Sequence, residues 1–334
     1  MNRRLRKPDQ RAGATDTPLF DTCIVIYNPI STQAQRAMKY TEQLQDFFSP
    51  DDLIFIPTSP EGKQANKALI VTQSAKLGKR TLLVVAGGDG TVNLVVDTLL
   101  HDSHLNTEMR QTTVLPFWGG NGNDLAHMLN GTPRHAHIRH ALETGRSVAI
   151  YPLSCEITRD DITHKYTAIC YASFGASAFA ASRLEKMRGI RPFFHAIGVV
   201  KFMHELSMVF RALLKASPFT VEDAKTTRPI FDRVFINGPR FAKVAGSPVS
   251  LTDKRFLHVV VEQKRVSSVA YHITQLTRRH AGRYTVEEGH SVAFTLREPA
   301  WAQIDGEVMY LHTGTKVRVS IDERAFYGLS TLLT

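Results

Sequence analysis

The stretch that decides the fold is TLLVVAGGDGTVN, residues 81–93. Its first part is an apolar run over 82–86, which predicts a buried β-strand. Three glycines follow, and they allow the backbone to turn tightly and to approach a ligand closely. Over 92–100 the apolar residues then take helical spacing. Because the free N–H groups at the start of a helix favour an anion, this strand, loop and helix predict a phosphate-binding turn.

The same alternation of strands and helices continues on both sides of this stretch. Strands are predicted at 23–27, 53–56, 82–86 and 112–116, and helices at 33–48, 62–77, 92–100 and from 124 onward. Apolar strands that alternate with helices are typical of a parallel sheet covered on both faces. We therefore predict a doubly wound α/β domain over residues 20–148, preceded by a disordered basic tail at 1–19.

The pattern changes near residue 150. Short strand-like runs, separated by Gly, Pro, Asn and Asp, lie at 151–157, 166–172, 233–237, 256–262, 291–296, 301–304 and 316–321. This spacing predicts an antiparallel β domain over 149–320, with a helical insert at 177–215. We expect the last residues, 321–334, to return to the first domain.

Composition and charge exclude several classes of protein. With 334 residues, of which 43% are hydrophobic and 22% charged, the chain is neither disordered nor collagen-like, and its length suits two domains. The three cysteines are scattered, which argues against a disulfide framework and for a reducing compartment. No secretory signal and no run of about 18 apolar residues is present. The net charge of +10 predicts an anionic partner: phosphates, nucleic acid or an acidic membrane surface.

A second glycine-rich loop, GGNGNDLA at 119–126, follows the fourth predicted strand. Two such loops at one sheet edge form a crevice, and Asn28-Pro29 would lie at the same edge. Asp89 is useful in a phosphate loop if it holds a cation or takes a proton. Two other interpretations remain open: a generic strand–helix turn for the first loop, and a simple helix cap for Asp124.

These elements together resemble the diacylglycerol kinase catalytic domain family, which includes sphingosine and ceramide kinases and bacterial lipid kinases. The motifs that carry the resemblance are Asn28-Pro29, Gly87-Gly88-Asp89-Gly90-Thr91, Gly122-Asn123-Asp124-Leu125-Ala126, Asn237-Gly238-Pro239 and Asp305-Gly306-Glu307. The first glycine box is shared with NAD kinases, whereas the Gly-Asn-Asp box is more specific to lipid kinases. The resemblance implies an NAD kinase-like α/β domain, a β-sandwich that holds the acceptor lipid, and ATP in the crevice between them.

The resemblance also implies roles for single residues. Contacts to the ribose and phosphates of ATP would come from Asn28, Thr58, Gly87, Gly88, Asp89, Gly90, Thr91, Gly122 and Asn123. Asp89 and Asp124 would lie near Mg²⁺, and Asp305 would be the general base with Glu307 beside it. Alternation along a strand would turn Asp305 and Glu307 to one face. A plain Asp-Gly turn between two strands is the competing interpretation.

The sequence departs from the family pattern in three places. Asn121 stands where a Thr is usual, and it keeps the capacity for hydrogen bonds. The segment 240–246 lacks most of the expected glycines. At 252–256 one carboxylate of an expected Asp-Asp-Gly element is missing, which disfavours the structural Mg²⁺ site of some bacterial members. These departures raise the alternatives of a divergent substrate or weak activity.

Three other features have two interpretations each. The His-rich segment 134–140 is interpreted as a solvated face rather than a metal site. The apolar and basic segment 177–215 is interpreted as a core-packing helix, with an interfacial helix pair that approaches lipid as the alternative. The basic clusters 3–7 and 278–280 are either solvated charge or contacts for anionic headgroups.

We predict an ATP- and Mg²⁺-dependent lipid kinase that is cytoplasmic and peripherally associated with an anionic membrane surface. Diacylglycerol is the first candidate acceptor and a sphingoid base the second. The alternatives are an NAD kinase-like enzyme and a weakly active nucleotide- or lipid-binding protein. No nucleic acid partner is expected, and a homodimer is compatible with the sequence.

Overall fold

The computed structural model describes residues 19–29, 42–117, 123–131, 136–186, 198–223, 226–241, 245–262 and 284–333. Several predicted features lie outside these residues. They are residues 1–18 of the basic tail, most of the helix predicted at 33–48, the loop residues 118–122 with Gly122, His135, and the basic cluster 278–280.

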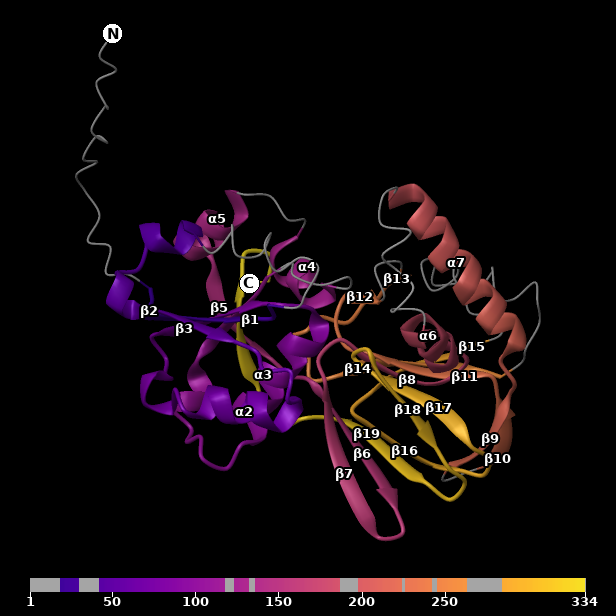
Figure 1. Ribbon diagram of the computed structural model, residues 1–334. Helices are drawn as coiled ribbons and strands as arrows, with labels where there is room; N and C mark the ends of the chain where they lie inside the picture. Colours follow the sequence, from indigo (N-terminus) through magenta and orange to yellow (C-terminus); the bar gives the residue numbers. More distant parts are fainter. Residues whose placement is uncertain are drawn as a thin grey trace, which may run out of the picture.

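The first domain is built on a six-stranded sheet, sheet A, in the order β2-β1-β3-β4-β20-β5. In that order its strands are β2 (Leu53–Pro57), β1 (Thr22–Tyr27), β3 (Thr81–Ala86), β4 (Thr113–Pro116), β20 (Phe326–Ser330) and β5 (Arg146–Ile150). The first five are parallel, and β5 runs antiparallel to β20. The C-terminal strand β20, yellow in Figure 1, therefore lies inside the first domain between β4 and β5.

Helices cover both faces of sheet A, which confirms the predicted α/β class. They are α2 (Lys63–Val71), α3 (Asp89–His101), α4 (Asp124–Asn130) and α5 (Ala136–Thr144), together with the short 3-10 turns η1 (Glu42–Asp46), η2 (Pro50–Asp52), η3 (Ser74–Lys76) and η4 (Met109–Gln111). Alternate residues of β1 point to opposite faces, so Ile24 packs with α3 while Cys23 packs on the side of α5 and η1. This two-sided burial explains why the strands are continuous apolar runs.

Helix α3 is buried on all sides over residues 92–100. It lies between sheet A and the second domain, so no face of it is left for solvent. It begins at Asp89, earlier than the residue 92 start expected from apolar spacing, because the glycine-rich residues before Val92 already take helical geometry. The helix therefore starts inside the predicted phosphate loop.

The second domain is a sandwich of two antiparallel six-stranded sheets, as expected. Sheet B contains β10 (Thr227–Ile230), β9 (Phe219–Asp223), β16 (Ser291–Leu296), β19 (Lys316–Ile321), β6 (Leu153–Arg159) and β7 (Ile162–Ala168). Sheet C contains β15 (Tyr284–Gly289), β14 (Phe256–Val261), β11 (Asp232–Ile236), β8 (Tyr171–Gly175), β17 (Ala300–Ile304) and β18 (Glu307–Leu311), and a short ribbon joins β12 (Arg240–Phe241) to β13 (Ala245–Gly246).

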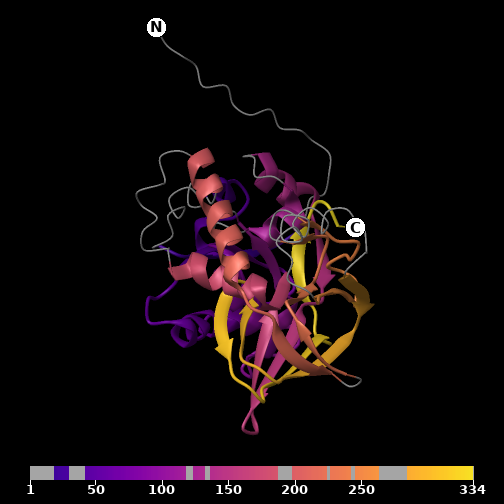
Figure 2. The same cartoon turned by 90° about the vertical axis from the view of Figure 1, so that its right-hand side faces the viewer.

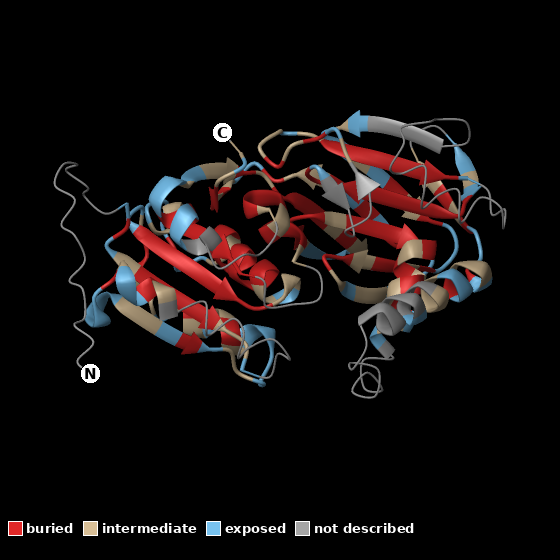
Figure 3. Ribbon diagram, turned by 90° about the horizontal axis from the view of Figure 1, so that it is seen from above, coloured by how far each residue is buried: buried red, intermediate tan, exposed pale blue. Residues whose placement is uncertain are grey.

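Aromatic side chains fill the space between sheets B and C. Phe174 of sheet C meets Phe294 of sheet B edge to face, with ring centroids 5.2 Å apart. Phe235 meets Phe256 in the same way at 5.5 Å. Buried residues, red in Figure 3, run through both domains and across the region where they meet.

The helical insert consists of two helices, α6 (Ala176–Lys186) and α7 (Gly198–Lys215), rather than one segment. Helix α6 lies on the outer face of sheet C against β8 and β17, and α7 packs against α6 (Figures 1 and 2). No helix within the described residues is both long enough and apolar enough to cross a bilayer.

A buried carboxylate holds the start of α6. Asp232, on β11, accepts hydrogen bonds from the backbone N–H of Ser177 at 3.2 Å and from its hydroxyl at 3.0 Å. Burial raises the pKa of Asp232 to about 7, although these hydrogen bonds oppose the shift. Asp232 therefore has hydrogen-bond partners as a helix cap, but burial of its charged form lowers the stability of the folded chain.

We expect this group to make folding stability depend on pH. Because the folded-state pKa of Asp232 exceeds the unfolded value, its contribution is full below about pH 4 and is lost as pH rises through about 7. The free energy of unfolding should fall over this window by at most about 1.4 kcal/mol per pH unit for one such group. Urea unfolding of Asp232→Asn across the window should give a shallower slope, because Asn cannot ionise.

Asp160→Asn is the matched control, because Asp160 lies in an exposed hairpin turn. Its pH slope should equal that of the unmodified chain. Equal slopes for all three proteins would contradict the assignment of the pH dependence to Asp232.

Candidate active site

The described residues that are predicted to contact the nucleotide gather at the carboxyl edge of sheet A. Asn28 follows β1, Thr58 follows β2 and Gly87 follows β3. Backbone hydrogen bonds tie these loops together: the Thr58 N–H donates to Tyr27 O at 2.8 Å, and the Asn28 N–H donates to Ala86 O at 3.4 Å. In the order β2-β1-β3-β4, β2 is added on one side of β1, and β3 and β4 are added on the other side. The strand order thus reverses between β1 and β3, and open α/β sheets bind their ligands at such a switch point.

The glycine loop has one position that admits no side chain. A Cβ atom at Gly87 would lie 2.6 Å from Thr91 Oγ1, so only glycine lets the loop close on the first turn of α3. At Gly90 a Cβ would meet nothing within 4 Å, and this residue is exposed. Gly90 therefore leaves open space at the first turn of α3, the end of a helix that favours a bound phosphate.

Asp89 joins the two loops. Its Oδ2 accepts the Asn123 N–H at 2.9 Å, and its Oδ1 accepts the Asp124 N–H at 3.2 Å. Asn123 takes a left-handed conformation at φ 57°, which turns the chain into α4. The Asp89 carboxylate thus caps α4 from the start of α3 and fixes Asp124 close to the glycine loop.

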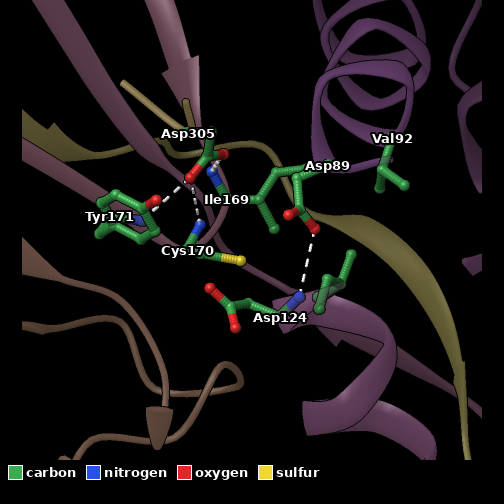
Figure 4. A pocket seen from close by; sticks show the side chains of 8 residues that line it. Asp89, Val92, Asp124, Ile169, Cys170, Tyr171 and Asp305 are labelled. Atoms are coloured by element: carbon green, nitrogen blue, oxygen red, sulfur yellow. Dashed lines mark hydrogen bonds between the residues drawn. The ribbon is translucent and has the colours of Figure 1, made fainter. Parts of the chain in front are cut away.

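A small pocket opens beside Asp89, between the two domains. It encloses about 270 Å³, part of it open solvent, and its walls come from both domains. The residues that line it are Asp89, Val92, Asp124, Leu125, Ile169, Cys170, Tyr171 and Asp305 (Figure 4). Asp89 and Asp305, which the kinase interpretation needs in one crevice, therefore share this pocket although 216 positions separate them in the numbering (305 − 89).

Negative charge is concentrated in this pocket. Burial, followed by repulsion from Asp124 and Asp305, raises the pKa of Asp89 to about 7. The two backbone hydrogen bonds that Asp89 accepts only partly offset these effects. A pocket of this kind stabilises either a bound proton or a bound cation.

Asp305 sits in a two-residue turn between β17 and β18. Asp305 and Gly306 have φ values of 44° and 92°, which is the geometry of a tight hairpin turn. The predicted alternation of Asp305 and Glu307 on one strand face is therefore wrong. Asp305 is buried in the pocket, whereas Glu307 is half-exposed and pairs with Lys63 of the first domain at 3.5 Å.

Four donors surround the Asp305 carboxylate. Its Oδ1 accepts the N–H groups of Cys170 and Tyr171, each at 3.0 Å, and its Oδ2 accepts the Ile169 N–H and the Asn93 side-chain amide, the latter at 3.1 Å. Burial raises the pKa of Asp305 even so, while all four hydrogen bonds favour its charged form. The carboxylate is thus held in one orientation.

Sequence reasoning missed Asn93 and the segment 169–171. Asn93 carried a usable signal, because it lies one helical turn after Asp89 and so shares its face of α3. The segment 169–171 carried none: its contribution comes from backbone N–H groups, and these do not depend on side-chain identity.

Two other segments come into question as metal sites from the sequence: the one around Asp253 and the His-rich segment 134–140. No three His, Cys, Asp or Glu side chains among residues that could be described are arranged to hold a metal ion. Asp253 accepts hydrogen bonds from the Ser250 N–H and from Arg255, so its partner is a cationic side chain. His140 of the His-rich segment is exposed on α5.

Residues 22–152 match the family model of the diacylglycerol kinase catalytic domain. A comparison with curated protein sequences finds no match.

Solved structures share the fold over most of the chain. A "putative diacylglycerol kinase" from Bacillus anthracis str. Sterne is 18% identical, with a TM-score of 0.68, over 94% of this chain and 98% of that one. A diacylglycerol kinase from the same organism is 15% identical, with a TM-score of 0.60, over 93% and 97%. Yeast NADH kinase complexed with NADH is 13% identical, with a TM-score of 0.51, over 94% and 84%. The resemblance seen in the sequence is thereby confirmed over residues 22–152, which are similar to the diacylglycerol kinase catalytic domain.

Proposed function

We propose that this chain transfers the γ-phosphoryl group of ATP to a lipid hydroxyl, with diacylglycerol as the first candidate acceptor and a sphingoid base as the second. The observation that carries the proposal is the shared pocket, in which Asp89 of the catalytic domain and Asp305 of the sandwich face the same space. Phosphoryl transfer needs a phosphate cradle and a carboxylate near the acceptor hydroxyl on opposite sides of one gap.

The triphosphate is proposed to lie on the carboxyl edge of sheet A. Residues 87–91 and the start of α3 offer backbone N–H groups, and Asn28, Thr58 and Asn123 border the same edge. Gly122 belongs to the same proposed set but lies outside the described residues. Because a helix N-terminus carries partial positive charge, no basic side chain is needed for the first phosphate contacts.

The pocket suits Mg²⁺ in the way kinases usually hold it. Mg²⁺ takes one or two carboxylates and completes its shell with water and phosphate oxygens, so Asp89 and Asp124 are sufficient as protein ligands. The raised pKa of Asp89 supports this assignment, because burial and then repulsion from Asp124 and Asp305 disfavour its charged form, and a cation would offset both. When bound, the ion would neutralise charge on the phosphates as the phosphoryl group leaves.

The acceptor hydroxyl is proposed to approach Asp305 from the sandwich side. Asp305 would take the hydroxyl proton while its backbone donors keep it aimed at the pocket. A carboxylate has about four acceptor positions and all are engaged here, so one hydrogen bond must lengthen as the hydroxyl arrives. Glu307 would act beside the pocket through its ion pair with Lys63 rather than at the reacting atoms.

A lipid acceptor brings the protein to a membrane surface. The net charge of +10 would favour anionic headgroups. Helix α7, which stands on α6 at the outer face of the sandwich, is a candidate for that contact. This peripheral association is part of the proposal.

An acceptor panel tests the proposed function. The full chain with ATP labelled at the γ-phosphate and Mg²⁺ should label diacylglycerol in phosphatidylcholine vesicles, and EDTA should abolish the transfer. Parallel reactions contain sphingosine in the same vesicles, or NAD in solution. Label on NAD alone would replace the lipid kinase by a nucleotide kinase, and ATP binding without any transfer would leave a binding protein.

Asp89→Asn separates a cation role from a capping role. The single amide oxygen keeps one of the two N–H hydrogen bonds from residues 123 and 124, the NH2 group faces the other donor, and the negative charge is gone. We expect phosphoryl transfer to fall by at least about a hundredfold, because the cation at the transferred group is no longer held. Thermal unfolding serves as the control, since the loss of one cap hydrogen bond should lower the melting temperature by only a few degrees and leave the chain folded. Unchanged transfer would reduce Asp89 to a helix cap.

A further inference from the structure

We propose that Asn93 is a positioning residue that fixes the Asp305 carboxylate relative to the glycine loop. The assignment rests on the proposed kinase function. Asn93 is buried, with 6% of its surface exposed, at the seam between the two domains.

The two hydrogens of the Asn93 amide are both used across the seam. Its Nδ2 donates to the backbone oxygen of Thr167 at 2.6 Å and to Asp305 Oδ2 at 3.1 Å. Both acceptors belong to the second domain. Because the amide nitrogen faces two oxygens, the side chain has one favourable orientation, and that orientation points it at Asp305.

Helix α3 fixes the distance between the residues that contact the second glycine loop and Asp305. Asp89 and Asn93 are four residues apart, so they lie on one face of the helix, separated by a rise of about 6 Å. Asp89 meets the second glycine loop and Asn93 meets Asp305. The gap between the phosphate loop and Asp305 is therefore set by one turn of a buried helix.

Asn93 also differs in kind from the other donors of Asp305. Those three are backbone N–H groups of residues 169–171, all in the second domain. Asn93 comes from the catalytic domain, so it links Asp305 to the loop that is proposed to hold ATP. Without Asn93, Asp305 would lose its hydrogen bond to α3, and the backbone donors of residues 169–171 would hold a carboxylate that is freer to move.

The next turn of α3 supplies a built-in comparison. Asp97 accepts a hydrogen bond from the Thr167 hydroxyl at 2.7 Å and pairs with Lys67 at 2.6 Å. Burial opposes ionisation of Asp97, but the hydrogen bonds from Lys67 and Thr167 outweigh it, so the pKa of Asp97 is lowered. The Thr167 hydroxyl thus crosses the same seam as Asn93 without a described contact to Asp305.

The experiment compares Asn93→Ala and Asn93→Asp with Thr167→Val in the full chain. Asn93→Asp keeps the shape of the side chain but places a carboxylate oxygen where the amide nitrogen met Thr167 O and Asp305 Oδ2. Thr167→Val removes the hydrogen bond to Asp97 across the seam without removing a contact of Asp305. Phosphoryl transfer and ATP binding are measured for each, together with hydrogen exchange of the peptide that contains residues 169–171.

Both Asn93 variants should lower kcat by at least about tenfold, because a displaced base loses its alignment, while ATP affinity stays within about threefold. Exchange of the 169–171 amides should become faster in both. Thr167→Val should keep kcat within about threefold of the unmodified chain. If Thr167→Val lowers kcat as much as Asn93→Ala, or if Asn93→Ala leaves both kcat and exchange unchanged, the positioning role is overturned.

The two readouts separate this inference from the proposed function. If the unmodified chain transfers phosphate to no acceptor in the panel, the kinase proposal fails, and the exchange rates still show whether Asn93 holds the Asp305 nest. If the unmodified chain is active and Asn93→Ala matches it in both readouts, only the positioning role fails.

Discussion

The arrangement of this protein depends on one buried carboxylate at the seam of two domains. Asp305 belongs to a tight turn of the sandwich, and its four hydrogen bonds come from the segment 169–171 of the same domain and from helix α3 of the first domain. An isolated carboxylate in such a place would be costly, and the ring of donors reduces that cost. Of these four hydrogen bonds, the one from Asn93 crosses between the two domains, and it lies beside the pocket that both domains line.

Helix α3 makes polar contacts along the whole seam between the two domains. Its face with residues at every fourth position meets the second glycine loop, Asp305, Thr167 and the chain segment that returns to sheet A. His101 at its last turn lies 3.4 Å from Asp322, just before β20. A helix with polar groups along one stripe and burial all round is unusual for a surface helix, and here the stripe is explained by the partner domain.

The buried carboxylates near the pocket differ in the groups that stabilise their charge. Asp305 has four hydrogen-bond donors, and Asp89 has two backbone donors that also serve as a helix cap. Farther along the seam, Asp97 has Lys67 as a direct partner. The carboxylates without a cationic side chain as partner therefore lie near the glycine loops, where the proposed cation and phosphates would bind.

Local pattern was sufficient for much of the fold and for half of the site. Strand and helix periodicity, the glycine boxes and the Asp-Gly turn depend on neighbours in the chain, and the α/β class, the sandwich and the place of Asp89 followed from them. What followed only from the tertiary structure was the meeting of Asn93 with Asp305, 212 residues apart, and the use of backbone N–H groups at 169–171. Sheet order decides which strand ends become neighbours, and a backbone donor leaves no mark on side-chain identity, so neither could be predicted from the sequence.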